Sequence, residues 1–334
     1  MDTVLLLGMG PTALSALESL AARFRVAGLV RDVQSSLEGE DEVIRRARAL
    51  EVPVLSDFSI EGIERAVIHS SPDCAVVSSY DRILPSRILG RCRFVNVHYA
   101  PLPQYRGRAN VNWAIINGEP ETAITVHVMA PGLDAGNILY QQTVPIGPDD
   151  TVGDLYSKLN EMQREILGET VARYISGYEG EPQDETAATY GCTRVPGDGE
   201  IDWASSTGQI YGLIRALAPP YPGAHTYLAA RRITILRAAP LANAPRYVGR
   251  IPGRIVGRSR RDGHVDVLTG DGVLEIYEVA ADDFPAGPAS ALIGSTRQTL
   301  GLRTADLLAR IELLESRLNL LDGAGCDAAS RDSR

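Results

Sequence analysis

The sequence predicts an α/β protein, with a Rossmann-like domain on a parallel sheet, a small OB-like β-barrel and a terminal helix. Three observations predict this class. In the first half, short apolar runs alternate with amphipathic segments, which is typical of a parallel sheet covered by helices. The second half has short strand-like runs separated by Gly and Asp. A chain of 334 residues is too long for one ordinary core and has room for two or three domains.

The first half opens on the apolar run Val4–Leu7, which ends in glycines and predicts a buried parallel strand. Pro11 suits the first turn of the helix that follows. Further strands are expected at residues 26–30, 52–55, 74–79, 94–98 and 124–129. Helices are expected at residues 11–23, 39–50, 60–69 and 151–178. Ligands of such sheets bind beyond the carboxyl ends of the strands, which draws attention to the end of the strand at 94–98.

The second half follows a polar linker at residues 180–188. Gly270-Asp271-Gly272 is a hairpin signal between two of its strands. Strands are expected at residues 233–236, 253–256, 264–268 and 273–277. We therefore expect a first domain at residues 1–189, the barrel at 190–302, a helix at 303–321 and a disordered tail at 322–334.

The terminal helix carries a heptad-like apolar seam. Its members are Leu307, Ile311, Leu314, Leu318 and Leu321. Such a seam either pairs two chains into a homodimer or packs against its own domain. The sequence leaves both arrangements open.

The composition limits the cellular location and the partners that we expect for this protein. A net charge of −9 and a pI of about 5.2 disfavour nucleic acid and anionic membranes as partners. No run of about 18 apolar residues occurs, and the start lacks a basic signal region, so we expect a cytoplasmic protein without a membrane partner. The four cysteines are Cys74, Cys92, Cys192 and Cys326. They are far apart and none has the spacing of metal ligands, so we expect a reducing compartment and no bound metal.

The strand at 94–98 ends in a pair of polar residues that could carry chemistry. Asn96 and His98 are two apart and therefore project from the same face of the strand. An amide donor beside an imidazole can stabilise an oxyanion and move a proton. Asp134 lies in a glycine-flanked loop, where a carboxylate could orient His98 or take a proton through water. Taken singly, these residues also have structural explanations: Asn96 and His98 as a polar pair that caps the strand, and Asp134 as an Asx-type loop residue.

Four motifs in order make the pattern more specific. They are Asn96-Val97-His98, Leu102-Pro103-Gln104-Tyr105-Arg106-Gly107, Asn117-Gly118-Glu119 and Gly132-Leu133-Asp134-Ala135-Gly136. This order resembles the 10-formyltetrahydrofolate-dependent formyltransferase family, and the resemblance spans most of the chain. It is most similar to the sugar-amine N-formyltransferases, such as the domain that formylates UDP-4-amino-4-deoxy-arabinose. The residues that favour this subgroup are Tyr105–Ala109, Asn112-Trp113, Ala218–Ala224 and Gln298–Leu302.

The resemblance implies roles for individual residues. Asn96, His98 and Asp134 match the family's catalytic set. Contacts to the folate are implied for Tyr80, Arg82, Ile83, Leu84, Leu102 and Leu133. Contacts to the acceptor are expected from Tyr99, Arg106, Arg108, Trp113 and Tyr221, with loop stabilisation or core packing as the alternative for Arg106, Arg108, Trp113 and Tyr221.

Some positions depart from the family pattern. Tyr99 replaces the small residue that commonly follows the histidine, and we expect it to reshape the acceptor pocket. The formyl-folate hydrolases have a second histidine at that place, so Tyr99 also speaks against hydrolysis. Ala135 and Asn137 replace Thr and Asp, and neither change removes a catalytic group.

Three further features of the sequence have more than one interpretation. Gly8-Met9-Gly10 with Asp32 suggests a dinucleotide site, but Ala13 stands where the third glycine would be. His127, in an apolar strand, is expected to be a core or wall residue. The arginine-rich stretch at residues 246–261 is the best case for a tRNA partner, with a solvated charged face as the alternative.

The sequence therefore predicts an enzyme that needs no metal and uses 10-formyltetrahydrofolate as cosubstrate. The expected acceptor is the amine of a nucleotide-linked amino sugar. Methionyl-tRNA and a (hydroxy)ornithine-type amino acid are alternatives, and an idle folate- or nucleotide-binding module is the alternative without catalysis. In the expected mechanism Asn96 and His98 hold the tetrahedral oxyanion, and Asp134 orients His98 and helps to remove the amine proton.

Overall fold

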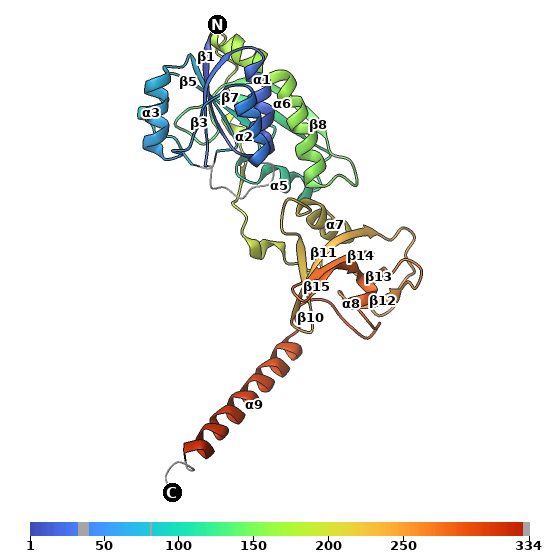
Figure 1. The fold of residues 1–334 in the computed structure, drawn as a ribbon. Coiled ribbons are helices and arrows are strands. Elements are labelled where there is room, and N and C mark those ends of the chain that lie inside the picture. The colour runs from blue at the N-terminus through green and yellow to red at the C-terminus, as the bar shows by residue number, and fades with distance from the viewer. Residues whose placement is uncertain (33–39, 81, 330–334) are drawn as a thin grey trace. The chain divides into compact units, whose positions relative to one another are not determined.

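The computed structural model describes residues 1–32, 40–80 and 82–329, and divides into two compact units, Met1–Val195 and Pro196–Arg334 (Figure 1). Asp81 and residue 39 of the expected second helix lie outside the described residues. The division falls later than the expected 189/190. Strand β9 (Tyr190–Gly191) pairs with β6 (Arg106–Gly107), which joins the segment after the linker to the first unit.

The first unit contains a seven-stranded sheet in the order β3-β2-β1-β4-β5-β7-β8. Its strands are β1 (Thr3–Gly8), β2 (Arg25–Val30), β3 (Val54–Leu55), β4 (Cys74–Ser78), β5 (Arg93–His98), β7 (Glu121–Val128) and β8 (Ile138–Pro145). Every residue of β1 and β4 is buried, as expected of central strands covered on both faces. The alternating pattern thus predicted the core of this sheet correctly.

One strand of the sheet, β7, runs against the expected direction. Strands β3, β2, β1, β4 and β5 are parallel, but β7 pairs antiparallel with β5, and β8 antiparallel with β7. The sheet is therefore mixed, and β8 was not expected. Burial explains why the sequence did not reveal the direction: residues 122–127 of β7 are all buried, and a strand buried on both faces has no polar face to orient it.

Helices cover both faces of this sheet (Figure 1). They are α1 (Gly10–Ala21), α2 (Glu40–Ala49), α3 (Ile60–Ser70), α4 (Ser86–Leu89), α5 (Asn110–Ile116) and α6 (Val152–Ile175), with a 3₁₀ turn at Glu185–Ala187. Helix α6 begins at a capping box in which Thr151 and Asp154 satisfy each other's backbone N–H groups. It docks on α1 because the buried Gln163 donates to the Thr12 carbonyl at 2.7 Å.

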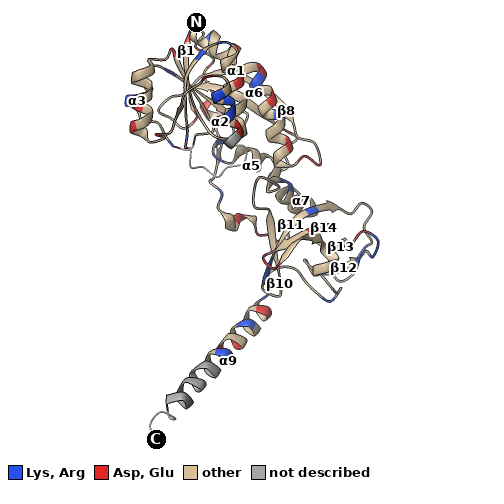
Figure 2. Cartoon of the chain, in the orientation of Figure 1, with Lys and Arg blue, Asp and Glu red and all other residues tan. Residues whose placement is uncertain are grey.

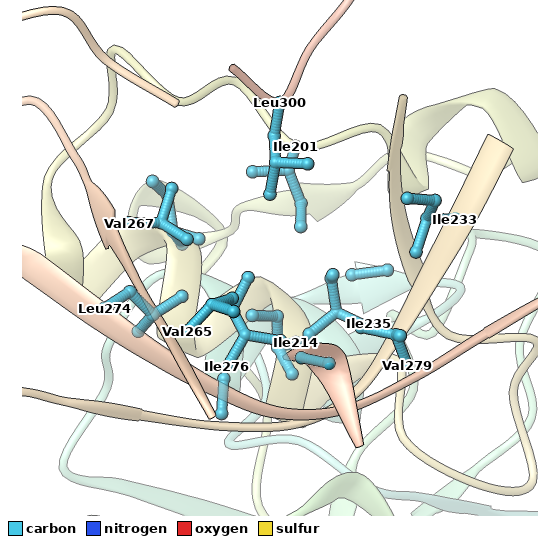
Figure 3. Close-up of a cluster of buried hydrophobic side chains, with 14 of the residues drawn as sticks. Ile201, Ile214, Ile233, Ile235, Val265, Val267, Leu274, Ile276, Val279 and Leu300 are labelled. Atoms are coloured by element: carbon cyan, nitrogen blue, oxygen red, sulfur yellow. The ribbon is translucent and has the colours of Figure 1, made fainter. Parts of the chain in front are cut away.

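The second unit is a small antiparallel barrel. Its strands are β10 (Ala224–Leu228), β11 (Arg231–Pro240), β12 (Ile255–Arg258), β13 (Val265–Leu268), β14 (Val273–Ala281) and β15 (Phe284–Pro288). Helices α7 (Thr207–Ala216) and α8 (Ala289–Leu292) and a 3₁₀ turn at Pro196–Gly199 accompany them. Bridges from Thr299 to Arg254 and from Leu300 to Leu228 join the two edges of the sheet, and inward Ile, Leu and Val side chains fill it (Figure 3).

Closure of this barrel depends on Gly253. Its φ is +80°, and an added Cβ would lie 2.2 Å from the Leu300 carbonyl oxygen, inside the closing bridge. We expect Gly253→Ala to lower the free energy of unfolding of this unit by about 1–3 kcal/mol, from backbone strain and the contact. Urea denaturation followed by fluorescence of the buried Trp203 measures this change.

Gly249→Ala is the matched control, because no atom lies within 4 Å of the added Cβ. We expect it to leave the urea midpoint unchanged. Equal midpoints for the two variants would show that the conformation of Gly253 is not required for closure.

Helix α9 (Thr304–Ala329) runs past the expected end at Leu321 and through part of the expected tail. Alanines 324, 328 and 329 favour this continuation and Gly323 and Gly325 disfavour it, so local propensity did not reveal where the helix ends. Residues 330–334 lie outside the described part of the chain. Among the described helices, α9 included, none is both long enough and apolar enough to cross a membrane.

Candidate active site

The end of β5 presents Asn96 and His98 on one face of the sheet. Their two-residue spacing does this, as the sequence predicts. The antiparallel register sets His127 of β7 directly opposite Asn96. His98 and His127 are buried, with 6% and 2% of their surface exposed, and their ring centroids are 6.2 Å apart. The sheet therefore places two imidazoles and an amide at one edge.

Asp134 enters from the loop between β7 and β8. Its Oδ2 accepts a hydrogen bond from the Gly107 N–H at 2.9 Å, and its own φ is +48°, a conformation that Asp tolerates better than most residues. The carboxylate lies between the two rings: Oδ2 is 3.7 Å from His98 Nδ1, and Oδ1 is 3.6 Å from His127 Nε2. Asp134 thus faces two histidines, where one was expected.

Hydrogen bonds fix the tautomer of His127 and the orientation of Asn96. His127 Nδ1 lies 2.9 Å from the Val128 carbonyl oxygen, which can only accept, so Nδ1 carries the hydrogen of the neutral ring. Nε2 is then an acceptor, and Asn96 Nδ2 donates to it at 3.1 Å. The Asn96 amide group retains a second N–H, which is available to a ligand in the site.

Hydrogen bonds also fix the tautomer of His98. Its Nε2 lies 2.8 Å from the Tyr105 carbonyl oxygen, so Nε2 carries the hydrogen and Nδ1 is the free basic nitrogen. Asn110 Nδ2 packs 3.1 Å from the same Nε2 and donates to the Gly107 carbonyl at 3.0 Å. The Tyr105 carbonyl therefore orients His98, a role that we had expected Asp134 to fill. The basic Nδ1 faces Asp134.

Burial and charge set the protonation states. Burial lowers the pKa of His98 below its usual 6.5, although the nearby Asp134 carboxylate opposes the shift. Burial alone would raise the pKa of Asp134, but the two histidines and the Gly107 N–H outweigh burial and lower it to about 2. At neutral pH the site therefore holds an ionised carboxylate beside an uncharged imidazole that can accept a proton.

A cavity of 570 Å³ opens beside these groups. Asn96, His98, His127 and Asp134 line it. Five of the six residues that the resemblance assigns to folate contacts also line it: Tyr80, Arg82, Ile83, Leu84 and Leu133. The exception is Leu102, which is 2% exposed and is not among the lining residues.

The residues expected at the acceptor are dispersed. Arg108 is exposed and lines the same cavity. Trp113 lines a separate hollow of 700 Å³ in the first unit, and its Nε1 donates to the Cys192 carbonyl at 2.9 Å. Tyr221 belongs to the second unit, where it packs against the barrel core.

Two further residues expected at the acceptor are held by other parts of the first unit. Tyr99 is 8% exposed, and its hydroxyl lies 2.8 Å from Asn160 Oδ1 on α6, so it does not line the cavity. Tyr99 follows His98 and continues the alternation of β5, so it points away from the face that carries Asn96 and His98 and reaches α6. The buried guanidinium of Arg106 donates to both carboxylate oxygens of Glu185, at 2.7 and 2.8 Å, and to Gln183. Arg106 therefore stabilises the loop that carries Gln183 and Glu185, which is the alternative to a contact with the acceptor.

The described residues contain one group with the ligand types and spacing of a cation site. His264 Nε2 lies 3.4 Å from both Asp266 Oδ1 and Glu275 Oε1, in the second unit. The cavity beside Asn96, His98 and Asp134 does not include these residues. That the reaction needs no metal stays an expectation.

Three participants in the site were not predicted: His127, the Tyr105 carbonyl and Asn110. An antiparallel register between the strands at 94–98 and 124–129 would have placed His127 opposite Asn96, so strand direction was the missing information. The other two lie in the loop and helix after β5, and no periodic pattern in the sequence indicates their approach to His98.

Two models of known protein families match the chain. The model described as formyl transferase matches residues 57–171, and the one described as formyl transferase, C-terminal domain, matches residues 195–295. The two matches fall in the two compact units separately, apart from a single residue at the division.

Solved structures share the fold. The N-formyltransferase from Helicobacter canadensis, solved with folinic acid and dTDP-3-aminofucose, has a TM-score of 0.60 at 19% identity, over 83% of this chain and 99% of that one. A 4-N formyltransferase from Francisella tularensis has a TM-score of 0.56 at 17% identity, over 67% of this chain and 91% of that one.

HypX from Aquifex aeolicus, solved with tetrahydrofolic acid, has a TM-score of 0.61 at 18% identity, over 88% of this chain. This chain spans 47% of that HypX chain, about half of its length. At these identities the likeness establishes the fold.

Proposed function

Since the chain belongs to the formyl transferase family, we propose that it is a formyltransferase whose donor is 10-formyltetrahydrofolate and whose acceptor is the amine of a nucleotide-linked amino sugar. One observation carries the proposal: a carboxylate lies between two imidazoles, with a free amide N–H beside them, at one wall of a cavity. Formyl transfer to an amine needs a base for the proton and a donor for the oxyanion, and these groups provide both.

The reaction follows from the protonation states. The acceptor nitrogen attacks the formyl carbon, and a C–N bond forms as the carbonyl electrons move onto oxygen. The second N–H of Asn96 stabilises this oxyanion. His98 Nδ1 takes the proton that the amine loses, and Asp134 stabilises the resulting imidazolium. Collapse of the intermediate breaks the bond to the folate nitrogen, which leaves with a proton, and the formamide is released.

The cavity suits a folate in size and lining. Its 570 Å³ is within the usual range for small-molecule sites. Ile83 and Leu133 expose 82% and 50% of their surface, and both line the cavity. Large apolar side chains left in water beside a polar centre favour a flat, partly apolar ligand such as a pterin with its aminobenzoyl ring.

The choice of a nucleotide-linked amino sugar rests on three supports. The subgroup motifs at Tyr105–Ala109 and Ala218–Ala224 are similar to the sugar-amine enzymes. Arg108 at the rim of the cavity offers an exposed guanidinium for a phosphate. The net charge of −9 disfavours tRNA.

The arginine-rich stretch also gives little support to tRNA. The side chains of Arg250, Arg254 and Arg258 donate to groups of their own unit, at 3.1, 2.8 and 3.0 Å. Guanidinium groups engaged within the fold have fewer free N–H donors for phosphates.

A turnover assay tests the proposal. The protein is incubated with 10-formyltetrahydrofolate and, separately, with UDP- and dTDP-linked amino sugars, ornithine, hydroxyornithine and methionyl-tRNA. We expect tetrahydrofolate release and a formamide product with at least one nucleotide sugar. Methionyl-tRNA or an ornithine as the only good acceptor would overturn the sugar assignment. Absence of transfer to every acceptor, with folate binding retained, would favour the idle binding module.

The lowered pKa of His98 predicts the pH dependence of turnover. Because uncharged His98 is the base, kcat at saturating donor and acceptor should stay level from pH 8 down through 6.5 and decline only below 6.5, the usual histidine pKa. The stability of the fold changes in the same direction, because the unfolded chain protonates this histidine first and its contribution to folding is lost as pH falls below 6.5. A pH profile of kcat in which the acid limb has its midpoint above 6.5 would contradict this state of His98.

His127 is expected to act as a positioning residue through Asn96. His127→Phe keeps an aromatic ring in the core but removes the Nε2 acceptor that fixes the Asn96 amide group. We expect kcat to fall by up to about 10², because a misplaced donor stabilises the oxyanion poorly, while the KM for the folate stays close to normal. His127→Gln, whose side-chain oxygen can accept from the amide, should restore part of kcat. A loss of folding without the kcat effect would indicate a purely structural role.

A further inference from the structure

Helix α9 exposes an apolar surface along its described length. Every described side chain from Leu307 to Leu318 is exposed. The large apolar ones have between 41% and 59% of their surface accessible: Leu307, Leu308, Ile311, Leu313, Leu314 and Leu318. The sequence left open whether the seam packs on its own domain. In the structure the described side chains of the seam do not pack there. So many exposed leucines on one helix are typical of a surface that binds a partner.

The spacing of these residues points to a second helix of the same kind. Leu307 and Leu314 fall at the d positions of a heptad repeat, and Ile311 and Leu318 at the a positions. Ile311 is β-branched, and such a residue at a with leucine at d favours two parallel strands over higher oligomers, whereas Leu318 at the other a position is not β-branched. In the sequence Leu321 continues the seam at d, although its side chain lies outside the described ones.

The charges beside the seam distinguish a parallel pair from an antiparallel one. Arg310 is at a g position and Glu315 is at the e position five residues on (Figure 2 shows the mixed charges along α9). In a parallel dimer a g residue of one helix faces the e residue of the next heptad on the other, so Arg310 faces Glu315 of a second copy, twice by symmetry. Arg317 and Asp322 repeat the pair in the sequence. In an antiparallel pair g would face g and e would face e, which brings like charges together.

We propose that α9 pairs with α9 of a second copy of this chain as a parallel two-stranded coiled coil, with Leu307, Ile311, Leu314 and Leu318 in its seam. The occupant of the apolar face is thus this chain itself. The proposed dimer is independent of the proposed acceptor, because its seam contains no residue that lines the cavity.

Two adjacent leucines provide a matched test. Leu313 and Leu314 are each 44% exposed, but Leu314 is at d in the seam and Leu313 is at c, outside it. Aspartate has the same helix propensity at either position, so loss of helicity affects both variants alike. The mass of the full chain is measured by sedimentation equilibrium over a roughly hundredfold concentration range, because such a short seam should dissociate on dilution. We expect Leu314→Asp to stay monomeric and Leu313→Asp to dimerise as the unaltered chain does.

Charge variants test the orientation. Glu315→Arg sets arginine against Arg310 of the second copy and should weaken the dimer at least tenfold. Arg310→Glu combined with Glu315→Arg exchanges the pair and should restore it. A monomeric unaltered chain at the highest concentration, equal behaviour of the two leucine variants, or a trimer or tetramer would each overturn the proposal. Formyl transfer is expected to persist in Leu314→Asp, so an effect on assembly is distinguishable from failure of the catalytic assignment.

Discussion

Asp134→Asn is expected to lower kcat by on the order of 10²–10⁴ while the protein stays folded, the range that loss of acid–base assistance typically costs. The amide is almost the same size as the carboxylate and its oxygen can still accept from the Gly107 N–H, so the loop should keep its place. The negative charge is lost at 3.7 Å from His98 Nδ1, where the proton of the amine arrives. Without that charge the imidazolium forms in a buried site with no counter-ion.

The measurement is kcat with saturating donor and acceptor, together with circular dichroism and the unfolding midpoint. Asp282→Asn, in an exposed turn of the second unit, is the control and should leave kcat unchanged. Near-normal turnover of Asp134→Asn would show that the carboxylate is only a loop residue, the alternative that its glycine-flanked position also allows.

Asn96→Ala is expected to lower kcat by on the order of 10²–10³, the typical effect of removing one oxyanion donor. Because the oxyanion exists only after the amine has attacked, the KM for the folate should change little. Asn96→Asp keeps the size of the side chain but replaces the N–H donor by a negatively charged acceptor. It should lose more activity than the alanine variant.

These two variants separate charge stabilisation from packing. A cavity left by alanine would reduce stability and could reduce turnover indirectly. The aspartate variant leaves no cavity, so a loss of packing cannot explain its loss of activity. If Asn96→Asp retained most of its turnover, the Asn96 amide group would have no part in holding the oxyanion, and the proposed mechanism would lose its donor.

The proposed dimer contributes nothing to these expectations. The proposed catalytic groups all lie in the first unit, and α9 lies in the second. Substitutions in the seam and substitutions in the site should therefore change the free energy of unfolding additively, as substitutions at distant positions usually do.

The sequence by itself determined the parts of this protein that follow from local period and local composition. Period two in the strand at 94–98 placed Asn96 and His98 on one face, and the apolar runs at Val4–Leu7 and 74–79 identified the central strands. The glycines around Asp134 indicated a loop that passes close to other backbone. Gly136 bears this out, because a Cβ there would lie 1.8 Å from the Val128 carbonyl oxygen.

Only the tertiary structure decided the direction of β7, and with it the place of His127 opposite Asn96. It also engaged Arg106 with Glu185. The physical reason is common to both. A side chain's partner depends on which segment, far along the chain, arrives beside it, and that is set by strand register and close packing, to which local periodicity is blind.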